Sequence, residues 1–340
     1  MPRSRTDKDG LDDRSTEAGR QPAPRRIART VLLALTGVCL IAASATYVSY
    51  RSDADALRAK ALEIVRSREA PAERVLTLTS WIHRHLGTAR NPEHFFLPGL
   101  RATPMQVLDK GGDCADKSRL LSAMLRQIGI PATMALCFHH DTGLPTHTVV
   151  EAQLGPGRYM VTDPAYELYY PDNHGGYFGI LDLRKHPERL VERVRYVQAT
   201  TPRFRPLHWY DPFEASAVGM STFNWRKNGL TMLVRDCLFL AIGPDVYRLP
   251  RPAVMEEPKL AVATMLLALA LVTLVLSRLA ARTPRRRDTS ESVLLAPATA
   301  RPVGPSPAIP IGGRDGSPRR EPLCGSDDAG KTECVISRNK

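Results

Sequence analysis

The chain has 340 residues, a formal net charge of +12 and an apolar content of 43%, which is ordinary for a protein with a globular core. This length suggests about two domains. The basic charge does not indicate a nucleic-acid-binding protein, because no aromatic residues are interleaved with it in a folded basic module.

Two uncharged apolar runs, at residues 30–50 and 260–277, stand out from the rest of the chain. Each is long enough to cross a bilayer as a helix. A cleaved signal sequence with Ala43-Ser44-Ala45 as its processing site is the alternative for the first run. A buried core helix is the alternative for the second. We favour two transmembrane helices, and the membrane is therefore an expected partner.

Arginine-rich segments lie at the outer ends of both runs, before the first and after the second. The positive-inside rule then places both termini in the cytoplasm and residues 51–259 outside it, in a two-pass protein of the inner membrane. The polar segment 1–29 and the basic, Pro-rich segment 278–340 lack periodic apolar positions. Both are predicted to be disordered cytoplasmic tails.

The exported part is predicted to contain a folded domain at 51–200 and a membrane-proximal extension at 201–259. Apolar periodicity indicates helices at 54–65 and 72–86, and a short helix follows at 105–108. A further pattern at 181–191 indicates a helix with a break near Pro187. In the extension, the helical pattern from Trp225 to Leu240 suits a helix that rests on the membrane surface or against the domain, or an ordinary buried helix.

The segment Gly111-Gly112-Asp113-Cys114 opens another predicted helix. Apolar residues from Ala115 to Ile128 recur with helical spacing, and Gly129 and Pro131 end the pattern. Asp113 is a suitable N-cap. Cys114 would therefore lie at the positive end of a helix dipole, where a thiolate is favoured over a thiol.

Two strand-like segments follow, His147 to Ala152 and Arg158 to Asp163, with the turn residues Gly155-Pro156-Gly157 between them. They predict a hairpin, in which His147 and Asp163 can lie side by side near one end of the sheet. If the Cys114 helix packs there, histidine can deprotonate the thiol and aspartate can orient the imidazole.

This ordered set of residues resembles the transglutaminase-like superfamily, a branch of the papain-like cysteine enzymes. The matching motifs are Gly112-Asp113-Cys114, Leu120-Leu121, Leu125-Arg126, Gly129-Ile130-Pro131, His147-x-x-x-Glu151 and Asp163-Pro164. The resemblance covers roughly residues 55–200. It implies an α+β papain-like domain, with the cysteine-bearing helix packed on an antiparallel sheet, between the two transmembrane helices. It also implies Cys114 as nucleophile, His147 as base and Asp163 as the orienting acid. Members often carry an aromatic residue where this chain has Val149, which leaves the shape of the substrate pocket open.

The resemblance implies a thiol enzyme that acts on amide or peptide bonds. The acyl group would pass to water, as in a cysteine peptidase or amidase, or to an amine, as in a transglutaminase. The topology suggests an envelope protein, peptide or glycoconjugate as substrate. The alternative is a non-catalytic scaffold of this fold within a cell-envelope or surface-polysaccharide assembly.

Several further residues have two readings. Gln106 is either an oxyanion hydrogen-bond donor beside the Cys114 backbone or an exposed helix residue. The aromatic residues between Tyr166 and Phe178 either line a substrate cleft or form a third strand pair. Cys137 and Cys237 either form a disulfide or stay unpaired. No cofactor is expected, since the histidines have no zinc spacing and Asp113 and Asp116 are too few for calcium.

Overall fold

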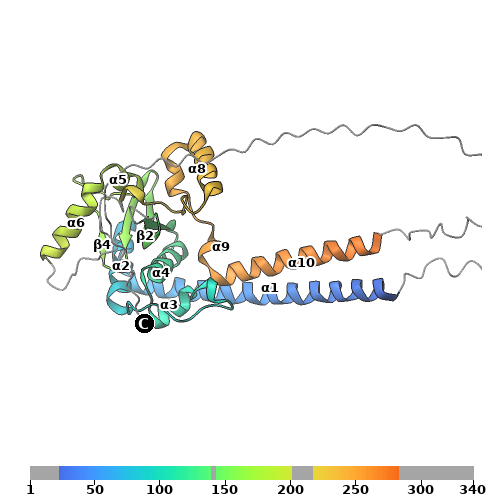
Figure 1. Ribbon diagram of the computed structural model, residues 1–340. Helices are drawn as coiled ribbons and strands as arrows, with labels where there is room; N and C mark the ends of the chain where they lie inside the picture. The colour runs from blue at the N-terminus through green and yellow to red at the C-terminus, as the bar shows by residue number, and fades with distance from the viewer. Residues whose placement is uncertain (1–22, 139–142, 201–216, 283–340) are drawn as a thin grey trace, which may run out of the picture. The chain divides into compact units, whose positions relative to one another are not determined.

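The structure is a computed structural model, and it describes residues 23–138, 143–200 and 217–282 (Figure 1). All of these belong to one compact unit. Most of the two predicted tails, at 1–22 and 283–340, and residues 201–216 of the predicted extension lie outside the described residues.

Two long apolar helices, α1 (Ala23–Ile64) and α10 (Pro258–Arg282), pack against each other along their length (Figure 1). They run antiparallel, because the hydroxyls of Thr36 and Thr273 share a 2.8 Å hydrogen bond while Lys259 Nζ lies 2.6 Å from Asp53 Oδ2. Both are long and apolar enough to cross a membrane. The two helices flank the folded domain in sequence and are consistent with a two-pass membrane protein.

Helix α1 differs from the prediction at both ends. Residues 23–29, predicted as part of a disordered tail, are its first two turns, since Pro24 suits the first turn of a helix and arginine is a good helix former. At the other end, the predicted span and the predicted helix 54–65 are one continuous helix. No glycine or proline between Arg51 and Ile64 interrupts it.

The first helical layer of the domain consists of α2 (Pro71–His85), the 3₁₀ turn η1 (Pro98–Leu100), α3 (Pro104–Lys110) and α4 (Cys114–Gln127). Helix α4 buries Leu120, Leu121, Met124 and Leu125, which form its predicted apolar stripe. These side chains pack with the end of α1, with α2 and with one face of the sheet.

The sheet has four antiparallel strands in the order β1 (Ala132–Phe138), β2 (Pro145–Gly155), β3 (Arg158–Asp163) and β4 (Leu168–Tyr169). The predicted hairpin is β2–β3. Strand β1 was not predicted, because its continuous apolar run shows no alternation. Beside β4, an isolated bridge joins Pro171 to Tyr177, so part of the aromatic segment pairs beside the sheet, while Tyr170 and Phe178 also line a surface pocket.

Successive residues of a strand place their side chains in two hydrophobic cores, one on each face of the sheet. Val150, Ala152 and Met160 join the core with α4, while Val149 and Val161 join a second core. The second core contains α5 (Ile180–Lys185) and α6 (Pro187–Thr200), which are separated at the predicted break. The domain is thus helix-rich α+β, as the sequence predicted.

The chain returns to α10 through α8 (Gly229–Ile242), the 3₁₀ turn η3 (Gly243–Arg248) and the short helix α9 (Ala253–Glu256). Helix α8 has no buried residue, so the buried-helix reading of this segment was wrong. The fully buried Glu256 side chain pairs with Arg126 at the end of α4, and it accepts a 3.2 Å hydrogen bond from the backbone N–H of Met134 in β1. The start of α10 is thereby fixed to the domain.

Candidate functional site

Cys114 is the first residue of α4 and is half-buried. The Asp113 side chain caps the helix by accepting 3.0 Å hydrogen bonds from the backbone N–H groups of Ala115 and Asp116. Asp116 returns a longer bond, of 3.4 Å, by accepting from the Asp113 N–H, which completes a capping box. The buried Asp116 carboxylate is also paired with Arg119 at 2.9 Å. The cap fixes the thiol at the positive end of the helix.

The two glycines before Cys114 are required by close backbone contacts. Gly111 has φ +77°, and a Cβ there would lie 2.8 Å from the Gly87 nitrogen. A Cβ on Gly112 would lie 2.4 Å from the Asp116 Cβ, inside the capping box. The Gly112 N–H donates to the Gly87 carbonyl at 3.2 Å. The loop at Gly87 and the entry to α4 therefore fit together only without side chains.

Lys117 supports the same loop, and sequence reasoning missed it. Its side chain is fully buried one turn after Cys114, and Nζ donates a 3.0 Å hydrogen bond to the Leu86 carbonyl. Burial lowers the pKa of this lysine, against the opposing effect of the nearby Asp163 carboxylate. No pattern in the sequence distinguishes Lys117 from an exposed helix lysine.

His147 and Asp163 are joined by a buried hydrogen bond. His147 Nε2 lies 2.7 Å from Asp163 Oδ2, and both side chains are completely excluded from solvent. The other carboxylate oxygen accepts a 2.9 Å hydrogen bond from the Ala165 N–H. The hairpin therefore places the two predicted residues together and holds the carboxylate in one orientation.

The helix that carries Cys114 is attached to the strand that carries His147. Helix α4 is fixed to β2 by the Ser118 hydroxyl, which donates to the Thr148 carbonyl at 2.9 Å. Burial alone would lower the pKa of His147, but the Asp163 carboxylate and, to a smaller extent, the Cys114 side chain raise it to about 10. Because Asp163 holds Nε2, Nδ1 is the ring nitrogen left to interact with sulfur. The arrangement favours an imidazolium beside the thiol.

Two further residues lie at this centre, and the sequence had not placed Cys137 there. The ring of Tyr166 lies 5.4 Å from the imidazole of His147, so one aromatic residue of the segment does contact the site. Cys137 lies opposite His147 in the β1–β2 ladder and is fully buried. Burial, followed by the negative charges of Asp163 and Cys114, raises the pKa of the Cys137 thiol well above its usual value. Two thiols thus lie in very different environments around one histidine.

The remaining predicted site residue, Gln106, has a structural role. Its side-chain oxygen accepts a 2.8 Å hydrogen bond from the Thr103 N–H in the capping box of α3. The role of its amide nitrogen as an oxyanion donor stays a prediction. Cys137 is a free buried thiol and Cys237 a free exposed one, so they form no disulfide. Within the described residues no group of three or more histidine, cysteine or acidic side chains could hold a metal ion.

Comparison with known proteins agrees with this fold. Residues 58–164 match the model of the transglutaminase-like superfamily. No curated protein matches the chain.

Two solved structures are similar to the chain. A candidate cysteine protease from Cytophaga hutchinsonii is 21% identical, with a TM-score of 0.29 over 36% of this chain and 40% of that one. A candidate protease from Parabacteroides distasonis is 17% identical, with a TM-score of 0.26 over 41% of this chain and 30% of that one. The chain thus spans less than half the length of either structure. Residues 58–164 are thus similar to the transglutaminase-like superfamily, and the α+β architecture of this part of the chain agrees with that match.

Proposed function

We propose that the protein is a membrane-anchored thiol enzyme that cleaves or transfers acyl groups from amide bonds. Cys114 is the nucleophile, His147 the general base and acid, and Asp163 the group that orients the imidazole. The observation that carries the proposal is the buried 2.7 Å hydrogen bond between His147 and Asp163, on the strand to which the helix that begins at Cys114 is attached. A structural cysteine at a helix start requires no such partners.

The proposed chemistry follows from the positions of these groups. The Cys114 sulfur gives its proton to His147 and attacks the carbonyl carbon of an amide. As the tetrahedral intermediate collapses, the imidazolium donates its proton to the departing amine nitrogen. A thioester then links Cys114 to the acyl group. Water or a second amine, deprotonated by His147, releases the acyl group and restores the thiol. Asp163 stays ionised throughout and stabilises the imidazolium.

The choice between water and an amine as acceptor follows from access to the thioester rather than from these three residues. The paired helices α1 and α10 support a substrate close to a bilayer, such as an envelope protein, peptide or glycoconjugate. In the proposed topology the domain lies outside the cytoplasm and both termini lie inside. Reporter fusions at residue 20, residue 200 and the C-terminus test it, and a cytoplasmic signal at residue 200 would refute the export.

Alkylation of the full chain by iodoacetamide, mapped by peptide mass spectrometry, tests the catalytic proposal. We expect rapid modification of Cys114 at pH 6 and slow modification of the buried Cys137. An ordinary thiol, with a pKa of about 8.5, is less than about 1% ionised at pH 6. His147→Ala is therefore expected to slow the reaction of Cys114 roughly 100-fold at this pH.

His174→Ala is the matched control, because His174 is an exposed histidine of the same domain. It should leave the alkylation rate unchanged. If Cys114 reacts like a free thiol in the wild type, and His147→Ala has no effect, the enzyme proposal fails. The chain would then be better described as a non-catalytic scaffold of the same fold.

A further inference from the structure

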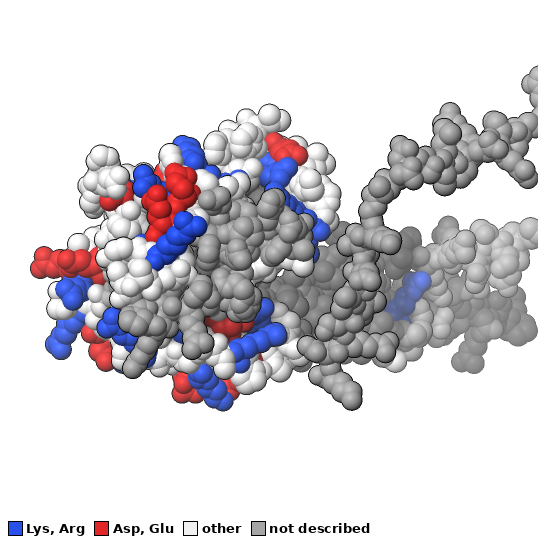
Figure 2. All heavy atoms as spheres, turned by 60° about the vertical axis from the view of Figure 1, so that its left-hand side comes forward, with Lys and Arg blue, Asp and Glu red and all other residues white. Residues whose placement is uncertain are grey.

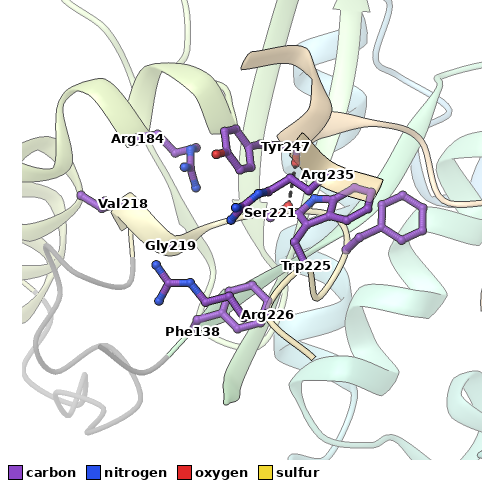
Figure 3. A pocket seen from close by; sticks show the side chains of 10 residues that line it. Phe138, Arg184, Val218, Gly219, Ser221, Trp225, Arg226, Arg235 and Tyr247 are labelled. Carbon is purple, nitrogen blue, oxygen red and sulfur yellow. Dashed lines mark hydrogen bonds between the residues drawn. The ribbon is translucent and has the colours of Figure 1, made fainter. Parts of the chain in front are cut away.

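A small pocket outside the Cys114 site gathers three arginines (Figure 3). Arg184 comes from α5, Arg235 from α8, and Arg226 from the segment before α8, and the three side chains converge on one space. Phe138, Trp225 and Tyr247 also line it. The pocket has a volume of about 50 Å³, which suits one compact anion rather than a nucleotide.

The positive charge of this arginine pocket is poorly compensated. Arg235 is paired with Asp236 at 2.7 Å, but that carboxylate is 60% exposed. Arg184 stacks on the Tyr247 ring at 3.7 Å and donates to the Met220 carbonyl at 2.8 Å, which supplies no negative charge. Within the part of the chain that the structure describes, neither Arg184 nor Arg226 forms a salt bridge. The pocket therefore carries a net excess of positive charge.

The environment of Arg184 is unfavourable for its positive charge. Burial lowers its pKa, the ionisable hydroxyl of Tyr247 raises it, and the charges of Arg226 and Arg235 lower it further. The Trp225 indole N–H is also buried, and it has no hydrogen-bond partner among the described residues. Guanidinium groups and an unpaired N–H around one small space are what a phosphate group requires, since its oxygens accept several charge-assisted hydrogen bonds.

Helix α8 borders the pocket and presents an apolar surface to solvent. Leu230 is 70% exposed, Leu233 59% and Leu240 88%, and four more large apolar side chains of the helix are also exposed: Met232, Val234, Phe239 and Ile242. A soluble protein seldom leaves a helix this apolar without a covering partner. A helix that lies in the membrane interface does so routinely, with its apolar side chains in the acyl region and its basic groups at the headgroups.

Only residues 243–257 separate α8 from the candidate span α10, so α8 is tied by a short connection to the membrane end of the domain. Elsewhere on the visible face of the domain, basic and acidic side chains are intermixed (Figure 2). The uncompensated positive charge is therefore a local feature beside the apolar helix rather than part of a broad basic field.

We propose that α8 and the arginine pocket together bind a phospholipid of the membrane, with the anionic headgroup phosphate in the pocket and the acyl chains along α8. This inference rests on the membrane anchoring proposed above but not on the chemistry at Cys114. The lipid holds the domain at a fixed tilt on the bilayer surface.

Native mass spectrometry of the full chain in detergent tests the proposal, with dioleoyl-phosphatidylglycerol, dioleoyl-phosphatidylcholine and inorganic phosphate as separate probes. We expect tighter binding of phosphatidylglycerol than of phosphatidylcholine. A basic residue near an anionic headgroup contributes about a fivefold gain in affinity, so the double variant Arg226→Gln/Arg235→Gln is expected to bind phosphatidylglycerol roughly 30-fold more weakly. Arg195→Gln, an exposed arginine on α6, is the matched control and should bind like the wild type.

A second variant separates a lipid from a free anion. Leu233→Asn/Leu240→Asn should weaken phosphatidylglycerol binding, because it makes the lipid-facing side of α8 polar. The proposal is overturned if phosphatidylglycerol and phosphatidylcholine bind equally and the arginine variant changes neither. It is also overturned if inorganic phosphate displaces the lipid completely and α8 substitutions have no effect, which would indicate a free-anion site. Protection of the fully buried Cys137 from iodoacetamide verifies that each variant is folded, and it keeps a failure here distinct from a failure of the enzyme proposal.

Discussion

Replacing Asp163 by asparagine keeps the shape of the side chain but removes the negative charge that faces His147. In the wild type the His147–Asp163 bond is 2.7 Å long and fully buried. A buried hydrogen bond to a charged group contributes about 1.5–3 kcal/mol. Asp163→Asn should therefore reduce the alkylation rate of Cys114 at pH 6 by roughly 10- to 150-fold, because burial then disfavours the imidazolium that stabilises the thiolate.

The same variant makes a prediction about stability. Asp163 raises the folded-state pKa of His147 to about 10, above its ordinary value of 6.5. A raised pKa means that the imidazolium stabilises the folded chain fully below about pH 6.5 and that this contribution disappears as the pH rises through about 10. The difference in unfolding free energy between wild type and Asp163→Asn should accordingly shrink across that range.

Both readouts are compared with Glu167→Gln, which removes a carboxylate four residues away. Glu167 pairs with Arg84 near the surface, where such pairs contribute little. This control should retain the alkylation rate and its pH profile. If Asp163→Asn also retains the wild-type alkylation rate and pH profile, Asp163 neither orients His147 nor stabilises its imidazolium, and the reasoning about the site is refuted.

Three further predictions concern the support of the site and the buried acids. Gly112→Ala should destabilise the fold by about 1–3 kcal/mol in urea unfolding, because the added Cβ has no room. Gly229→Ala is the control, because Gly229 has open space around it, and it should leave the stability unchanged. Equal effects of the two substitutions would contradict the crowding argument. Burial raises the pKa of Glu151 to about 7, so the unfolding free energy should fall as the pH rises from about 4.5 to 7 and Glu151 ionises. The dependence of the unfolding free energy on pH should be weaker in Glu151→Gln, and an unchanged dependence would contradict this. Glu256→Ala should destabilise by about 1–3 kcal/mol, because the Met134 N–H loses its buried acceptor and Arg126 keeps only Glu257, 3.5 Å away. A loss below about 0.5 kcal/mol would contradict this.

The parts of the fold that the sequence predicted are those encoded by local patterns. Helix α4 follows from the spacing of its apolar residues between the Asp113 cap and Gly129, and the β2–β3 hairpin follows from two short strands around Gly155-Pro156-Gly157. His147 and Asp163 meet because both lie on this hairpin. The local sequence pattern of the hairpin was therefore enough to predict that these two residues lie together.

The features that were missed depend on contacts between distant segments. Strand β1 is an apolar run without alternation, so neither its pairing with β2 nor the position of Cys137 opposite His147 could be read from it. The burial of Lys117 depends on how the Leu86 loop folds over α4. The arginine pocket requires α5 and α8 to approach each other, and no pattern within either helix predicts that approach.

The central claim is that His147, held by Asp163, activates the Cys114 sulfur. The ultraviolet absorbance of the thiolate, taken as the difference between the wild type and Cys114→Ser across pH, measures this directly. The account predicts that the thiolate signal is present at pH 6 and disappears there in His147→Ala. A signal that emerges only near pH 8.5, the range of an ordinary cysteine, and is the same with and without His147, would contradict it.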